Sequence, residues 1–205
     1  LVNKMGAKDP GLKILGSHRQ LNHYFIDGDL KIFQKKLDQY IEPQKKMEFE
    51  TICKQANNYS IRTRLADSRL ILVIKGSLND HSSANGIIRM EFESDIQGLS
   101  LEELDKLILD CGFKYQAKWS RERQSFQYKN IDVAVDKNAG YGYLAEFEKQ
   151  INEQTLADQA KKELEKIMAE LDVSELPQAR LERMFKFYND NWQDYYGTDN
   201  FFTIE

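Results

Sequence analysis

The chain has 205 residues, of which 41% are hydrophobic, and its formal net charge at pH 7 is −4. That length is enough for one well-buried domain and an appendage. The acidic balance argues against a general nucleic-acid binder, which usually carries a surplus of basic residues. Apolar runs stay well below the roughly 18–20 residues of a membrane-spanning helix, so no membrane span is expected.

The two cysteines, Cys53 and Cys111, are not spaced as a metal or redox motif. A chain of this size with two cysteines does not suggest a disulfide scaffold, so a reducing compartment is favoured. We therefore expect a cytoplasmic protein. The sequence leaves the oligomeric state open, a homodimer included.

The first part of the chain predicts a strand, a helix and then further strands. Residues 19–27 alternate loosely between polar and apolar side chains, which indicates a strand, and residues 30–40 have helical spacing. From Met47 to Ile74 the pattern predicts β-structure, including strands over 59–65 and 69–75. Residues 76–86 are polar and indicate a flexible loop.

The middle of the chain begins with a predicted strand over 87–94. A capping box follows at Ser100–Glu103, in which side chains satisfy the free amides at a helix start. Apolar residues at helical spacing continue to Ile108, and Gly112 follows as a C-terminal cap. Three more strands are expected at 115–128, 131–136 and 143–148.

The character of the sequence changes after about residue 151. Residues 156–171 predict an amphipathic helix, and a second helix is expected to begin at 174–177. The last segment, 189–205, is rich in aromatic residues, which we expect to dock onto the chain's own domain. We divide the chain into a domain over residues 1–150 and a helical extension over 151–205.

Charged residues recur at two-residue spacing along the predicted strands. Because residues two apart in a strand point to the same face, each doublet shares a face. The cations are Arg62, Arg64, Lys75, Arg121 and Arg123, and the acids are Glu91, Glu93, Asp136, Glu146 and Glu148. Such cations can bind a polyanion and such acids can bind a divalent metal, which together is the chemistry of a triphosphate site.

A simpler interpretation is a solvated sheet face with surface ion pairs, as one-sided antiparallel sheets often have. Two features favour a ligand site instead. Most doublets carry a single sign, which is repulsive unless an opposite charge or a ligand lies across from them, and the alternate positions on the same strands are apolar. We therefore expect an α+β fold: an antiparallel barrel or tunnel with charges inside and helices over its apolar outside.

The ordered series R-x-R, K-G, E-x-E, a helix, a basic doublet, D and a final E-x-E resembles the CYTH superfamily, which includes class IV adenylyl cyclases and triphosphatases. The resemblance spans about Arg19–Gln150 and implies a triphosphate tunnel of about eight antiparallel strands with flanking helices. It also implies roles for the charged residues. The five cations, with Lys118 as an additional candidate, would bind the triphosphate and act in catalysis. The five acids would hold Mg²⁺ or Mn²⁺.

The activity that the resemblance implies is metal-dependent hydrolysis of a triphosphate compound, such as tripolyphosphate, a nucleoside triphosphate or thiamine triphosphate. Two alternatives stay open. One is cyclisation of ATP to cyclic AMP, and the other is a non-catalytic module that binds polyphosphate or nucleotide. No residue discriminates between hydrolase and cyclase, because none marks an adenine pocket.

One motif of the family is missing. E-x-E-x-K is expected before Arg19, but Leu1–Ser17 contains no glutamate. The nearest approach, Glu48 and Glu50, has Ile52 where the lysine would stand, so we interpret it as an ordinary edge-strand face. Because the sequence begins with leucine rather than methionine, we expect that the first strand has been lost by truncation.

Overall fold

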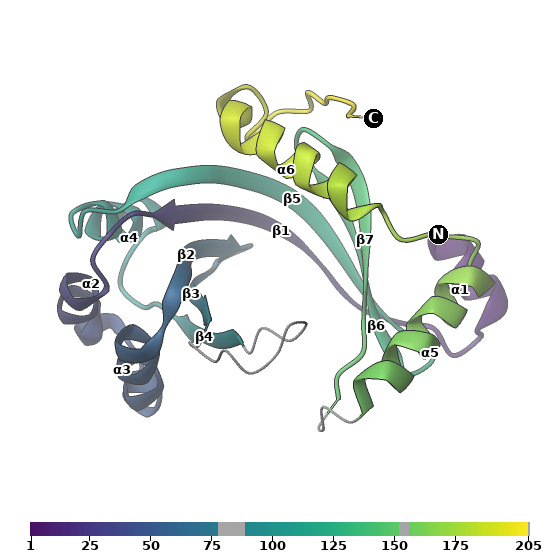
Figure 1. The fold of residues 1–205 in the computed structure, drawn as a ribbon, viewed down its shortest axis with the longest axis horizontal. Helices are drawn as coiled ribbons and strands as arrows, with labels where there is room; N and C mark the ends of the chain where they lie inside the picture. Colours follow the sequence, from purple (N-terminus) through teal and green to yellow (C-terminus); the bar gives the residue numbers. More distant parts are fainter. Residues whose placement is uncertain (78–88, 152–155, 205) are drawn as a thin grey trace. The chain divides into compact units, whose positions relative to one another are not determined.

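The computed structural model describes residues 1–77, 89–151 and 156–204 (Figure 1). The helices are α1 (Val2–Lys8), α2 (Leu30–Leu37), α3 (Lys46–Gln55), α4 (Leu101–Leu109), α5 (Ala157–Glu170) and α6 (Gln178–Asn191). The strands are β1 (Lys13–Ile26), β2 (Asn57–Ala66), β3 (Arg69–Ser77), β4 (Arg89–Asp95), β5 (Lys114–Tyr128), β6 (Ile131–Asn138) and β7 (Gly142–Glu148). Most of the predicted loop over 76–86, and the start of the predicted strand over 87–94, lie outside the described residues.

The seven strands form one sheet in the order β4-β3-β2-β1-β5-β6-β7. The pairs β1–β2, β2–β3, β3–β4, β5–β6 and β6–β7 are antiparallel. The predicted α+β class, an antiparallel sheet with flanking helices, is confirmed. Over the described residues the sheet ends at β4 and β7 and does not close into a barrel.

The chain divides into two compact units. The central unit is Gln20–Ser120, and the terminal unit combines Leu1–Arg19 with Arg121–Glu205. Strands β1 and β5 contribute residues to both units. The domain boundary predicted at residue 150 falls inside the terminal unit, and it remains a prediction.

The core of the central unit lies between its sheet and the helices α2, α3 and α4. Helices α2 and α3 lie side by side against the β2–β4 part of the sheet (Figure 1). Alternate residues of the strands point into this core, as in the cross-strand row Ile61, Ile74 and Phe92. All three side chains are fully buried. The opposite face of the same strands therefore carries the charged doublets.

Helix α3 corrects one prediction from the sequence. Residues 47–55 were expected to be β-structure, with Glu48 and Glu50 on an edge strand, but they form a helix. The reason is the spacing of Phe49, Ile52 and Cys53, three and four residues apart, which places all three on one buried helical face. The two glutamates lie on the exposed side of that helix.

The predicted start of helix α4 is confirmed. Ser100 Oγ accepts from the Glu103 amide, and the Glu103 carboxylate accepts in turn from the Ser100 amide. Helix α2 begins in a related way, since Asp29 Oδ1 accepts from the amides of Lys31 and Ile32. These caps fix where each helix begins relative to the neighbouring strand.

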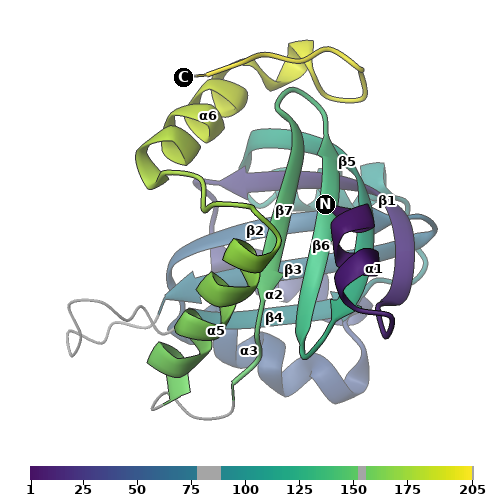
Figure 2. The ribbon, with the colours of Figure 1, turned by 90° about the vertical axis from the view of Figure 1, so that its right-hand side faces the viewer.

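The terminal unit has its own core, on one face of β5 and β6. Helices α1 and α5 lie over this part of the sheet (Figure 2). Their buried side chains, such as Met5 and Ile167, join Phe126 and Val133 of the strands. Alternation along β5 and β6 therefore places Arg121, Arg123 and Asp136 on the other face. Helix α1 was not predicted from the sequence.

The C-terminal aromatic segment docks onto the turn between β6 and β7, as expected. Tyr188 of α6 is fully buried, and its ring packs edge-on against Tyr141. Phe202 packs against the same tyrosine, and its amide donates to the Gly140 carbonyl over 2.7 Å. The described residues contain no helix that is both long and apolar enough to cross a membrane.

Candidate functional site

The predicted site residues divide between the two units. Arg62, Arg64, Lys75, Glu91, Glu93 and Lys118 belong to the central unit, and Arg121, Arg123, Asp136, Glu146 and Glu148 belong to the terminal unit. Within each unit the structure places the doublets on the sheet face opposite the hydrophobic core. We call these two surfaces the Arg62 face and the Arg123 cluster.

Arg62 is the most unusual residue of the Arg62 face. It lies opposite Tyr24 of β1, and its Nη1 donates to the Tyr24 hydroxyl over 3.1 Å. Its guanidinium carbon lies 5.5 Å from the centre of the same ring, a cation–π distance. Its Nε is buried and has no hydrogen-bond partner among the described residues. A buried donor without an acceptor is costly, so this group calls for a physical explanation.

Arg64 is held by a different neighbour. It lies opposite Asn22 of β1, and its Nε donates to Asn22 Oδ1 over 3.1 Å. Asn22 itself is buried, so its amide orients the guanidinium from a fixed position. Sequence reasoning missed both Asn22 and Tyr24, because their importance depends on the β1–β2 register rather than on any motif.

The other predicted site residues of the central unit are Lys75, Glu91, Glu93 and Lys118. Lys75 lies opposite Glu91, and the Nζ to Oε2 distance is 3.1 Å. Both side chains are close to half exposed, so this pair contributes little to stability. Glu93 is exposed and makes no hydrogen bond or ion pair to another described residue. Lys118 lies with its Nζ 4.2 Å from the centre of the Tyr115 ring.

The Arg123 cluster is built around one buried carboxylate. Asp136 is 2% exposed and lies opposite Arg123. Arg123 donates to it twice, from Nε over 2.7 Å and from Nη2 over 2.6 Å, and Arg121 Nη1 donates over 2.8 Å. Such a bidentate pairing is the strong form of this interaction.

Glu146 completes the cluster from β7. Arg123 Nη2 donates to Glu146 Oε2 over 2.6 Å, and Arg121 Nη1 lies 3.7 Å from Oε1. Burial by itself disfavours the charged form of Arg123. Hydrogen bonds and charge from Asp136 and Glu146 outweigh burial and raise its pKa further above the usual range. Two arginines therefore meet two carboxylates, and the charges of these four side chains cancel.

Glu146 and Glu148 are the acids of this cluster that solvent reaches. Glu148 is exposed and makes no hydrogen bond or ion pair to another described residue, whereas both oxygens of Asp136 accept from arginine. Over residues 1–77, 89–151 and 156–204, no three His, Cys, Asp or Glu side chains form a group that could hold a metal ion. A cation bound here would need ligands from another source, such as phosphate.

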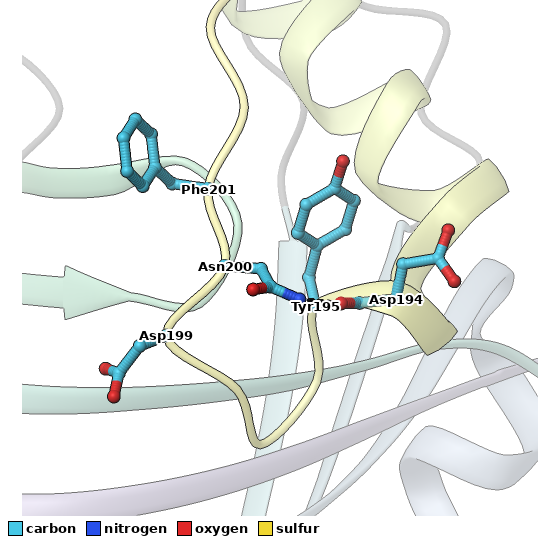
Figure 3. Close-up of a pocket in the computed structure, with 5 residues that line it drawn as sticks. All are labelled: Asp194, Tyr195, Asp199, Asn200 and Phe201. Atoms are coloured by element: carbon cyan, nitrogen blue, oxygen red, sulfur yellow. Dashed lines mark hydrogen bonds between the residues drawn. The ribbon is translucent and has the colours of Figure 1, made fainter.

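A pocket of about 400 Å³ lies elsewhere, in the segment that follows α6 (Figure 3). It is lined by Asp194, Tyr195, Asp199, Asn200 and Phe201. Asp199 accepts from Lys137 over 3.2 Å. None of the predicted site residues lines this pocket.

Three comparisons relate this geometry to known proteins. The family model for the CYTH domain matches residues 34–180. None of the curated proteins compared matches the chain.

Several solved structures share the fold. The PH1819 protein of Pyrococcus horikoshii has a TM-score of 0.58 and 20% identity, over 90% of this chain and 94% of its own. The PH1012 protein of the same organism has a TM-score of 0.57 and 15% identity, over 85% and 87%. A protein of Vibrio parahaemolyticus named as a candidate adenylate cyclase has a TM-score of 0.56 and 13% identity, over 90% and 89%.

The likeness to these structures concerns the fold alone. The family match covers more than half of the sequence and includes every predicted site residue. The chain belongs to the CYTH domain family.

Proposed function

We propose that this protein is a divalent-metal-dependent enzyme that binds a triphosphate compound and hydrolyses it. Membership of the CYTH family and the tunnel-like α+β fold support an enzyme that binds a triphosphate. The observation that carries the proposal is Arg62, whose buried Nε lacks an acceptor among the described residues. A phosphate oxygen would supply that acceptor, because arginine pairs well with phosphate.

The other cations would share the charge of the same ligand class. Arg64 is oriented by Asn22, and Lys75 is exposed enough to exchange Glu91 for a phosphate oxygen. In hydrolysis, water attacks the terminal phosphorus and the bridging P–O bond breaks, so charge on the phosphate oxygens must be neutralised. Fixed guanidinium groups can do this without rearranging during the reaction.

The metal would be held mainly by the exposed carboxylates. Mg²⁺ and Mn²⁺ take oxygen ligands, and Mg²⁺ commonly uses one or two carboxylates together with substrate phosphates. Glu91 and Glu93 of the central unit are exposed, as are Glu146 and Glu148 of the terminal unit, and each pair taken by itself suits that role. Asp136, also expected to bind metal, would first have to release an arginine. The ion, when bound, would neutralise charge on the phosphates.

The test is phosphate release from tripolyphosphate, ATP and thiamine triphosphate, each with Mg²⁺ and with Mn²⁺, while cyclic AMP is assayed in the ATP reactions. We expect metal-dependent release that falls at least tenfold in Arg62→Ala. Arg69→Ala is the matched control, since Arg69 lies in the same unit and its partner is Asp95, over 2.9 Å. It should retain activity.

Other results would redirect the proposal. Cyclic AMP without phosphate release would assign the cyclase. Tripolyphosphate that raises the melting temperature without being hydrolysed would assign a binding module. Equal activity in Arg62→Ala and the wild type would contradict the role given to the Arg62 face. The cytoplasmic location and a homodimer remain predictions.

A further inference from the structure

A buried polar network lies inside the otherwise apolar core of the central unit. Its centre is Asp105 of α4, which is 3% exposed. Its neighbours along the helix, Leu104 and Ile108, belong to the hydrophobic core. A carboxylate in such surroundings is costly unless its oxygens accept hydrogen bonds, so its presence calls for a physical explanation.

Asp105 gathers hydrogen bonds from three different strands. Thr63 Oγ1 of β2 donates to Oδ1 over 2.8 Å. Tyr115 Oη of β5 donates to Oδ2 over 2.7 Å. The Nδ1 of His23, on β1, lies 2.5 Å from Oδ2. One side chain of a helix thus links the three strands that are adjacent in the order β2-β1-β5.

The network lies directly behind the arginines of the Arg62 face. Thr63 stands between Arg62 and Arg64 on β2, and His23 is its cross-strand partner on β1. The residues on either side of His23 are Asn22 and Tyr24, which hold those same two arginines. Side chains alternate between faces along a strand, so anchoring Thr63 and His23 on one face fixes the backbone that presents the arginines on the other.

We propose that Asp105 is a positioning residue for the phosphate-binding cations Arg62 and Arg64. This inference rests on the proposed function, because it assigns the arginines a ligand. Asp105 would act through the backbone of β1 and β2, because its hydrogen bonds hold His23 and Thr63 at a fixed distance from α4. Small displacements of binding groups weaken binding strongly, so loss of this anchor lowers affinity for the anion even where the fold persists.

The test measures binding of tripolyphosphate by calorimetry without added metal, so that metal ligation does not enter. Thr63→Val keeps the shape of the side chain and removes the donor, and Asp105→Asn removes the charge. Both variants should bind tripolyphosphate about tenfold more weakly than the wild type does. Binding is measured at a temperature at which urea unfolding shows that each variant is folded. Thr63→Ser restores the hydroxyl and should restore most of the affinity. Should Asp105→Asn fail to fold, Thr63→Val and Tyr115→Phe carry the test.

Ser94→Ala is the matched control. Ser94 is buried on β4 between Glu93 and Asp95, as Thr63 is between two arginines, and its hydroxyl donates to the Asp95 carbonyl rather than to Asp105. It should lose stability without losing affinity. Thr63→Val and Asp105→Asn could likewise lose stability and keep their affinity for tripolyphosphate, while Arg62→Ala abolishes binding. In that case the network is structural and the positioning role is wrong.

A second readout separates this inference from the proposed function. The Nε–H of Arg64 donates to Asn22, so its NMR signal should exchange slowly with water in the wild type and quickly in Thr63→Val. If the wild type does not bind tripolyphosphate at all, the proposed function fails. Unchanged Arg64 exchange in Thr63→Val would overturn the positioning role, whatever the ligand proves to be.

Discussion

Arg123 on β5 donates two hydrogen bonds to the buried carboxylate of Asp136 on β6, from Nε over 2.7 Å and from Nη2 over 2.6 Å. The two residues are direct cross-strand partners, so the pairing also fixes how the two strands align. Arg121, two residues before Arg123, donates to the same carboxylate over 2.8 Å. One acid therefore removes the repulsion between two arginines that share a strand face.

Asp136→Asn should lower the free energy of unfolding by about 2–4 kcal/mol, because it removes the buried charge that both guanidinium groups share and leaves them only the exposed Glu146. Glu146→Gln is the control: it removes the charge of the other carboxylate that pairs with Arg123, but the Glu146 side chain is 58% exposed. It should cost less than about 1 kcal/mol. Urea unfolding measures both. Equal losses would mean that burial does not decide the strength of these pairs.

Much of this arrangement could be predicted from the sequence, because strand alternation is a local property. The doublets of β2, β4, β5 and β7 occupy one face each, as two-residue spacing requires. What could not be predicted is which residues lie opposite one another. Arg62 meets Tyr24 only because β1 pairs with β2 in one particular register, and register depends on the whole core.

Two other features of the structure differ from what the local sequence pattern indicates. Glu48 and Glu50 suggested a strand because two acids stood two apart, but the apolar Phe49, Ile52 and Cys53 obey helical spacing. Asp105 was overlooked although its position on the apolar stripe of α4 was a readable signal. A polar residue on a buried helical face must find partners, and those partners lie on strands far away in the sequence.

The Tyr24 hydroxyl offers a mild test of the Arg62 face. Tyr24→Phe removes the acceptor of Arg62 Nη1 and keeps the ring beneath the guanidinium. We expect tripolyphosphate to bind about fivefold more weakly, which corresponds to one hydrogen bond of roughly 1 kcal/mol. Tyr143→Phe, at a tyrosine that is 71% exposed, is the control for loss of a hydroxyl. Unchanged affinity in Tyr24→Phe would mean that this hydroxyl does not orient Arg62 for binding.

Cys53 makes stability depend on pH in the alkaline range. Burial raises the pKa of its thiol from 9.0 to about 12 in the folded protein. Above pH 9 the unfolded chain loses this proton while the folded chain keeps it, so the free energy of unfolding falls as pH rises. The slope from this one group is at most about 1.4 kcal/mol per pH unit.

Urea unfolding between pH 8 and about pH 10.5 tests this contribution. The wild type should lose stability more steeply above pH 9 than Cys53→Ala, which has no thiol to ionise. Parallel curves for the two proteins would show that the thiol is ionised equally in both states. Absolute stability is not the readout, because the alanine also leaves a small cavity.

Two glycines of the β6–β7 turn allow the cost of backbone strain to be distinguished from the cost of a steric clash. Gly140 and Gly142 have φ values of +85° and +76°, in a backbone region that residues other than glycine rarely adopt. A Cβ on Gly140 would lie 2.7 Å from the ring of Tyr188, whereas nothing lies within 4 Å of one on Gly142. Gly142→Ala should therefore cost only the backbone term, about 1 kcal/mol.

Gly140→Ala should cost that term and also displace the buried Tyr188, for a total of about 2–4 kcal/mol. Because Gly140 also exchanges hydrogen bonds with the C-terminal segment, over 2.7 Å to Phe202 and 3.1 Å to Asn200, that segment should loosen. Limited proteolysis after Phe202 and Tyr195 would then speed up in Gly140→Ala and not in Gly142→Ala. Equal destabilisation and equal cleavage in the two variants would mean that backbone strain accounts for both, and that the aromatic segment is not anchored at Gly140.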